Sequence, residues 1–187
     1  ALREMGVRID LSCGLEVRVQ GVGLNGLCPP RRPLDLGNSG TSARLFAGLL
    51  AGQRFESVLT GDASLQRRPM QRVVTPLRQM NADLTCTEGG TLPIHIKGSQ
   101  GLKGIHYVMP VASAQLKSSL LLAGLYAEGR TCIEESVPTR DHTERLLARF
   151  SCPVDRTGRT VCISKTDQLT AADITVPGDI SSAAFPM

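Results

Sequence analysis

The feature that most constrains the fold of this chain is an internal repeat. The segment LREMGVRI at 2–9 recurs as LRQMNADL at 77–84 and, more loosely, as LARFSCPV at 147–154, at intervals of about 70 to 75 residues. Small polar residues that open an apolar helix recur in step with it, in GNSGTSARLFAGLLAG at 37–52 and ASAQLKSSLLLAGLYAEG at 112–129. A repeat of this length is one supersecondary unit, so we expect the chain to consist of copies of a single motif.

Two kinds of segment alternate within each unit. Residues 15–20, 94–97 and 161–164 largely alternate apolar and polar side chains, which is typical of strands with one buried face. Residues 45–52 and 118–127 are apolar almost all round, which is typical of helices inside a core. We therefore predict an α/β (α+β) fold made of repeated βαβαββ units, with buried helices and outward-facing sheets.

The second helix of the middle unit is expected to start at Arg68–Pro69, because proline favours the first turn of a helix. Its apolar side chains recur at helical spacing and predict one buried face: Met70, Val73, Val74, Leu77 and Met80.

Composition gives weak support for a nucleic-acid partner, and a small anionic partner fits it at least as well. The net charge of +4 is spread along the chain, and aromatic residues for base stacking make up only 3%. No apolar run approaches the roughly 18–20 residues of a membrane-spanning helix. The six cysteines form no C-x-x-C motif and have no histidine at zinc-ligand spacing, so we predict reduced thiols, no metal site and a cytoplasmic protein.

Candidate binding residues gather at helix starts. Small residues at 37–41 would let backbone N–H groups approach an anion, although the same residues serve as an ordinary turn and N-cap. Ser113 can cap the next buried helix, whereas capping does not require the amide of Gln115. Arg68 and Arg140 each precede a helix and could face a phosphate or a carboxylate, or simply be solvated.

The segment PTRDHTERLLARF contains two further candidates. Asp141 and Glu144 have capping-box spacing, so Asp141 is predicted to be structural. His142 falls in the first helical turn, where the helix dipole disfavours its cation, so we do not expect it to act as an acid. No acid–base pair, activated nucleophile or metal cage is evident.

Five ordered motifs together resemble the 5-enolpyruvylshikimate-3-phosphate synthase family of the bacterial shikimate pathway: GNSGTSARL, GDASLQRRPM, PVASAQLKSSLLLAGL, TRDHTERLL and VPGDISSAAF. The resemblance covers essentially the whole chain. It implies an enolpyruvyl transferase fold of two domains, each with three βαβαββ units. Residues 1–178 would be most of the N-terminal domain, with units at about 1–33 (partial), 34–104 and 105–178. Residues 179–187 would start the crossover to a C-terminal domain that this chain lacks.

The resemblance also implies a reaction and its binding residues. The family transfers the enolpyruvyl group of phosphoenolpyruvate to the 5-hydroxyl of shikimate 3-phosphate, releasing phosphate through a tetrahedral intermediate without metal or cofactor. By position, the residues that match its phosphoenolpyruvate contacts are Gly40, Arg68 and Gln115. Those that match its shikimate 3-phosphate contacts are Ser113, Ala114, Gln115, Thr139 and Arg140.

The family's general acid and base residues have no counterpart in this chain, so the resemblance implies a half-site with little turnover. Glyphosate occupies the phosphoenolpyruvate position in this family, and glycine at position 40 implies a sensitive full-length enzyme. Two alternatives are a UDP-N-acetylglucosamine enolpyruvyl transferase, which should carry a reactive-loop cysteine near Gly and Arg, and a non-catalytic module that binds anions or nucleic acid.

Overall fold

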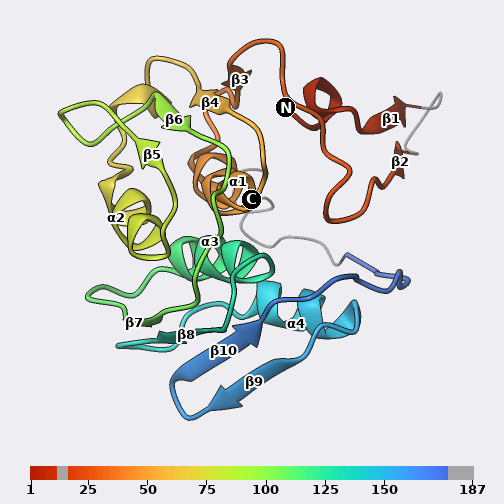
Figure 1. The fold of residues 1–187 in the computed structure, drawn as a ribbon, viewed down its shortest axis with the longest axis vertical. Helices are drawn as coiled ribbons and strands as arrows, with labels where there is room; N and C mark the ends of the chain where they lie inside the picture. Colours follow the sequence, from red (N-terminus) through yellow and green to blue (C-terminus); the bar gives the residue numbers. More distant parts are fainter. Residues whose placement is uncertain (12–16, 177–187) are drawn as a thin grey trace, which may run out of the picture.

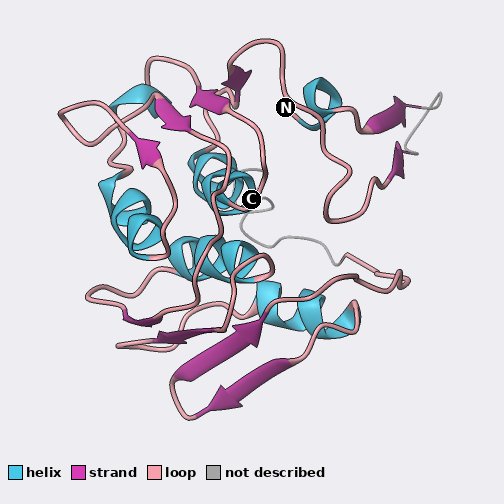
Figure 2. Cartoon of the chain, viewed as in Figure 1, coloured by secondary structure: helices cyan, strands magenta, loops and turns pink. Residues whose placement is uncertain are grey.

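The computed structural model describes residues 1–11 and 17–176. Helices lie between two four-stranded sheets, as Figures 1 and 2 show. The first sheet contains β3 (Leu34–Asp35), β4 (Ser57–Thr60), β5 (Leu84–Thr85) and β6 (Ile94–Ile96). The second contains β7 (His106–Val108), β8 (Arg130–Glu134), β9 (Val154–Thr157) and β10 (Thr160–Ser164).

The helices of the described chain are α1 (Gly40–Ala51), α2 (Gln71–Gln79), α3 (Ala114–Gly124) and α4 (His142–Arg149). Two short 3-10 turns, η1 (Leu2–Met5) and η2 (Leu65–Arg67), accompany them. Near the N-terminus, β1 (Arg8–Leu11) and β2 (Val17–Gln20) form a separate antiparallel pair.

The two large sheets have the same topology. Their strand orders are β3-β4-β6-β5 and β7-β8-β10-β9, and in each the first pair is parallel and the other two pairs are antiparallel. Along the chain, both units run strand, helix, strand, helix, strand, strand. The predicted βαβαββ order and its repetition are therefore confirmed. The unit boundaries near 33 and 104 remain predictions, and the segment 179–187 lies outside the described residues.

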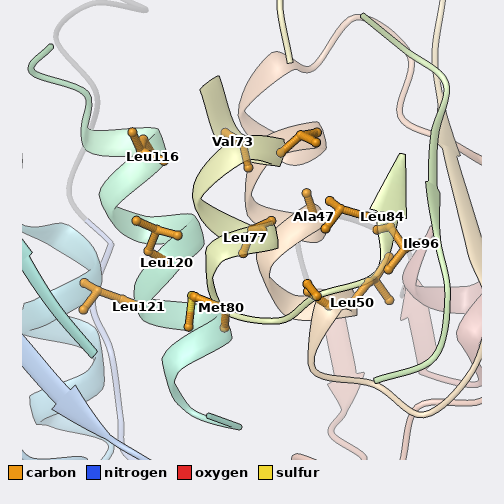
Figure 3. Close-up of a cluster of buried hydrophobic side chains, with 14 of the residues drawn as sticks. Ala47, Leu50, Val73, Leu77, Met80, Leu84, Ile96, Leu116, Leu120 and Leu121 are labelled. Atoms are coloured by element: carbon orange, nitrogen blue, oxygen red, sulfur yellow. The ribbon is translucent and has the colours of Figure 1, made fainter. Parts of the chain in front are cut away.

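The apolar helices α1 and α3 pack against each other in the middle of the molecule, as their composition predicts. Their side chains form one core with α2 and the first sheet (Figure 3). All five residues predicted for the buried face of α2 have no exposed surface: Met70, Val73, Val74, Leu77 and Met80. Burial of each such side chain contributes about 1.5–3 kcal/mol, which fixes the helices and hence their first turns.

The second helix of the middle unit begins later than predicted. Arg68 is extended, with φ −77° and ψ 140°, and α2 begins at Gln71. The reason is local, because the ring of Pro69 disfavours helical geometry at the residue before it. Arg68 therefore lies in a short connection between η2 and α2.

The prediction that all cysteines are reduced is wrong for one pair. A disulfide joins Cys132 on β8 to Cys162 on β10. These residues are direct partners in the antiparallel register of the two strands, with their Cα atoms 4.1 Å apart, and a sequence separation of 30 residues does not reveal this pairing. The other cysteines of the described chain are the free thiols Cys28, Cys86 and Cys152, while Cys13 is outside it.

In the described ranges, 1–11 and 17–176, no helix is long and apolar enough to cross a membrane. Nor do three or more metal-binding side chains come together anywhere in these ranges.

Candidate functional site

A cleft of about 450 Å³ opens where the first turn of α3 faces α4. Its lining comes from three helices and the loop before α4: Thr41, Leu45, Ser113, Ala114, Gln115, Ser118, Arg140, His142, Thr143 and Leu146. Four residues that the sequence singled out for an anion site therefore share one cleft, namely Ser113, Ala114, Gln115 and Arg140.

Ser113 and Gln115 have different roles at the start of α3. The Ser113 hydroxyl accepts a hydrogen bond from the Leu116 N–H at 3.3 Å and so caps the helix. Gln115 instead contacts α1: its Oε1 accepts from Arg44 Nη1 at 2.9 Å, and its Nε2 donates to Thr41 Oγ1 at 2.9 Å. This one amide joins the first turns of the two buried helices.

At the start of α1, a glycine leaves room for two arginine side chains to approach the helix. Ser39 caps this helix by accepting from the Ser42 N–H at 3.1 Å, and Gly40 is buried behind it. A Cβ atom on Gly40 would lie 2.9 Å from Arg44 Nη1 and 3.0 Å from Arg68 Nη1. The absence of a side chain therefore lets two guanidinium groups reach the helix start, while Arg68 is also anchored by a hydrogen bond to Asn38 Oδ1.

These arginines form an electropositive cluster. Burial lowers the pKa of Arg44, and the positive charges of Arg72 and Arg68 lower it further. Within the described part of the chain, the acceptors that the Arg44 guanidinium contacts are uncharged, namely Gln115 Oε1, Gly40 O and Pro69 O. Like charges at a helix N-terminus repel one another and would be stabilised by an anion with several oxygens.

Arg140 and Thr139 differ in accessibility. Arg140 is exposed and lines the cleft just before α4. Thr139 does not line it, since its N–H and hydroxyl both donate to Glu135 Oε1. Gly40 and Arg68 also lie outside the lining, but Arg44 connects Gly40 to Gln115 at the edge of the cleft, and the Arg68 guanidinium lies beside Gly40.

The predicted capping box at the start of α4 is wrong. Asp141 occupies the N-cap position without a side-chain cap and instead accepts from Arg145 Nε at 2.9 Å. Glu144 turns inward, where its Oε1 lies 2.6 Å from Lys117 Nζ. The buried ammonium of Lys117 requires carboxylate partners, and this tertiary demand overrides the local motif.

Arg44 is the functional candidate that the sequence reasoning missed. It belongs to the GNSGTSAR motif but was not singled out. The spacing between Gly40 and Arg44 could have indicated it. Residues four apart lie on the same face of a helix, so Arg44 lies one turn beyond Gly40 on the same face.

The sequence and the structure of this chain both match known proteins of one family. The family model described as "EPSP synthase (3-phosphoshikimate 1-carboxyvinyltransferase)" matches residues 1–187. Similar proteins named 3-phosphoshikimate 1-carboxyvinyltransferase include one from Methylococcus capsulatus, 63% identical over 187 residues, and one from Alkalilimnicola ehrlichii, 61% identical over 183 residues. They cover 100% and 98% of this chain, which spans only 43% and 41% of their own lengths.

A solved structure of EPSP synthase from Acinetobacter baumannii superposes on this chain with a TM-score of 0.93 at 52% identity. The superposition covers 98% of this chain and 41% of that one. Sequence and fold thus agree over nearly the whole of the chain, and in each comparison it corresponds to less than half of a longer protein.

Proposed function

Since the chain belongs to the EPSP synthase (3-phosphoshikimate 1-carboxyvinyltransferase) family, we propose that it supplies one half of an active site for enolpyruvyl transfer. The proposed reaction moves the enolpyruvyl group of phosphoenolpyruvate to the 5-hydroxyl of shikimate 3-phosphate and releases phosphate. The remaining half would come from the C-terminal domain of the full-length protein. The observation that carries this proposal is the Gln115 amide, which joins two anion-favouring helix starts.

Phosphoenolpyruvate is assigned to the start of α1. Its phosphate and carboxylate need cationic, multiply donating partners, and Arg68 and Arg44 lie beside Gly40 with their guanidinium groups. Gly40 leaves the space that a side chain would fill. Glyphosate, also an anion, is expected to compete for the same position.

Shikimate 3-phosphate is assigned to the cleft. The first N–H groups of a helix have no intrahelical acceptor. At the start of α3, Ser113 takes up the N–H groups of Leu116 and Lys117 through its hydroxyl and carbonyl. Those of Ala114 and Gln115 have no acceptor among the described residues, so we assign them to the substrate, with Arg140 in the same cleft for the 3-phosphate.

Gln115 would then lie between the two substrates and orient them. Its two hydrogen bonds to α1 fix the amide, so the enolpyruvyl carbon and the 5-hydroxyl would be held close without a further loss of freedom. Protonation of the double bond and removal of the hydroxyl proton would fall to groups of the absent half. The isolated chain is therefore expected to have little turnover.

Phosphate release tests this assignment. The full-length protein and the 187-residue chain, the latter checked for folding by circular dichroism, are assayed with both substrates and with UDP-N-acetylglucosamine as the alternative acceptor. We expect the full-length protein to release phosphate from phosphoenolpyruvate when shikimate 3-phosphate is the acceptor, and not when UDP-N-acetylglucosamine is. Robust phosphate release by the isolated chain would overturn the half-site assignment. A preference for the UDP-sugar would overturn the assignment of shikimate 3-phosphate as the acceptor.

A further inference from the structure

A fully buried lysine lies directly behind the cleft. Lys117, on α3, has no exposed side-chain surface, and its neighbour Ser118 lines the cleft. Its Nζ lies 3.0 Å from Glu135 Oε1 and 2.6 Å from Glu144 Oε1. One ammonium group thus connects α3 with α4 and with the residue that follows β8.

Glu135 extends this connection to the loop before α4. Its Oε1 accepts hydrogen bonds from the Thr139 N–H at 2.9 Å and from the Thr139 hydroxyl. Its own N–H donates to Arg159 O at 2.9 Å, and Arg156 lies 3.8 Å from its Oε2. The carboxylate therefore holds the residue immediately before Arg140, the cation at the mouth of the cleft.

The Glu135 carboxylate is ionised in this setting. Burial alone would raise its pKa, but the hydrogen bonds from Thr139 and Lys117 outweigh burial and hold the pKa below its ordinary value. Thr139 can therefore donate two bonds to a fixed, charged acceptor, which gives stronger and shorter contacts than a neutral one.

Stability alone does not account for this cluster. Taking charges out of water costs free energy that pairing repays only in part, and buried ion pairs are often replaceable by apolar residues. What distinguishes this cluster is its place, since three of the elements that it joins carry or border the cleft: α3 through Ser113–Gln115, and α4 and its preceding loop through Arg140.

We propose that Glu135, held by Lys117, is a positioning residue that fixes the 136–140 loop so that Arg140 faces the start of α3. The inference rests on the proposed function, because it assigns Glu135 an effect on the sugar-phosphate substrate through Arg140. Loss of the carboxylate frees Thr139, and Arg140 then samples orientations that do not meet the phosphate.

The test is a double-mutant cycle in the full-length enzyme, with Glu135→Gln, Arg140→Ala and the double variant. Glutamine keeps the volume of Glu135 but removes the charge that Lys117 and Thr139 share. We expect each single variant to raise the KM for shikimate 3-phosphate about tenfold, the size of one charge-assisted hydrogen bond. The double variant should be no worse than Arg140→Ala alone, because Glu135 acts through Arg140.

Glu144→Gln is the matched control, since Glu144 pairs with the same lysine but does not contact Thr139. A cluster that only stabilises the fold would give Glu135→Gln and Glu144→Gln similar KM values at similar loss of thermal stability, which would overturn the proposal. Additive effects of Glu135→Gln and Arg140→Ala would also overturn it.

If Arg140→Ala leaves the KM unchanged, the assignment of Arg140 to the substrate is wrong, and the failure belongs to the proposed function. If Glu135→Gln does not fold, Glu135→Asp enters the same cycle. It keeps the charge on a shorter side chain and must show the same non-additivity with Arg140→Ala.

Discussion

Gly48 on α1 lies directly against the backbone of Ser119 on α3. A Cβ atom at Gly48 would lie 2.0 Å from the Ser119 carbonyl oxygen and 2.8 Å from its Oγ. No shift of a flexible side chain can relieve a contact with backbone, so the spacing of the two helices depends on glycine here. This close packing fixes α1 and α3 relative to each other and brings Thr41 within reach of Gln115.

Substitution Gly48→Ala should therefore destabilise the protein by about 3 kcal/mol, at the upper end of the range for overpacked cores. The free energy of unfolding in urea measures the effect. Gly89→Ala is the matched control, because Gly89 is exposed and a Cβ there meets only Thr87 Oγ1 at 3.9 Å. Equal unfolding midpoints for the two variants would contradict the packing argument.

Substitution Gly40→Ala should weaken binding at the start of α1. The added methyl group would compete for space with Arg44 Nη1 and Arg68 Nη1, which are assigned to phosphoenolpyruvate. We expect the full-length enzyme to be glyphosate-sensitive, and the variant to need at least about tenfold more inhibitor, equivalent to about 1.4 kcal/mol. The glyphosate concentration needed for half-maximal inhibition, at a fixed concentration of phosphoenolpyruvate, measures this effect. Gly21→Ala is the control, because a Cβ atom there meets nothing within 4 Å. An insensitive parent enzyme would refute the assignment.

Substitution Gln115→Ala should raise the KM for both substrates. It removes the two hydrogen bonds to Arg44 and Thr41 as well as the group assigned to the space between the ligands. An effect of about tenfold on each KM is expected from a lost hydrogen bond to a charged group. Steady-state kinetics of the full-length enzyme tests this, beside Gln79→Ala on the exposed side of α2. A change confined to one KM would show that Gln115 serves a single subsite.

Acid should selectively weaken the cluster around Glu135. Its pKa is held below the ordinary value of 4.5, so its stabilisation is complete above that pH and is lost as the pH falls through the lower, folded-state pKa. Among the described residues, the charged groups that pair with it are Lys117 and Arg156, and Lys117 also pairs with Glu144.

We therefore expect the difference in unfolding free energy between the parent and Glu135→Gln to shrink as the pH falls below the ordinary value of 4.5. Urea unfolding at half-unit pH steps measures this difference. A difference that is constant or grows on acidification would show that the folded protein does not favour the carboxylate.

The sequence was most informative where local pattern and burial coincide. The all-round apolar composition of 45–52 and 118–127 predicted the two buried helices, and the spacing of Val73 and Leu77 predicted the buried face of α2. Both signals depend on neighbours within one element, and both were confirmed. The repeat likewise predicted the second unit from the first, since the two sheets share one topology.

The late start of α2 has a local cause in Pro69, but the other errors share a different one, which is partnership between distant elements. The pairing of Cys132 with Cys162 depends on the register of β8 and β10. The inward turn of Glu144 depends on a lysine 27 positions earlier, and Lys117 itself lies in a helix whose apolar composition gave no reason to expect a buried charge. Arg44 was overlooked because its contact with Gln115 exists only once α1 and α3 have packed.

The most direct test of the central claim is a crystal structure of the full-length protein with shikimate 3-phosphate and glyphosate bound. The account predicts the 3-phosphate between Arg140 and the start of α3, glyphosate beside Gly40 and Arg68, and the Gln115 amide within hydrogen-bond distance of both ligands. Ligands bound on another face, or a Gln115 side chain that contacts neither of them, would contradict it.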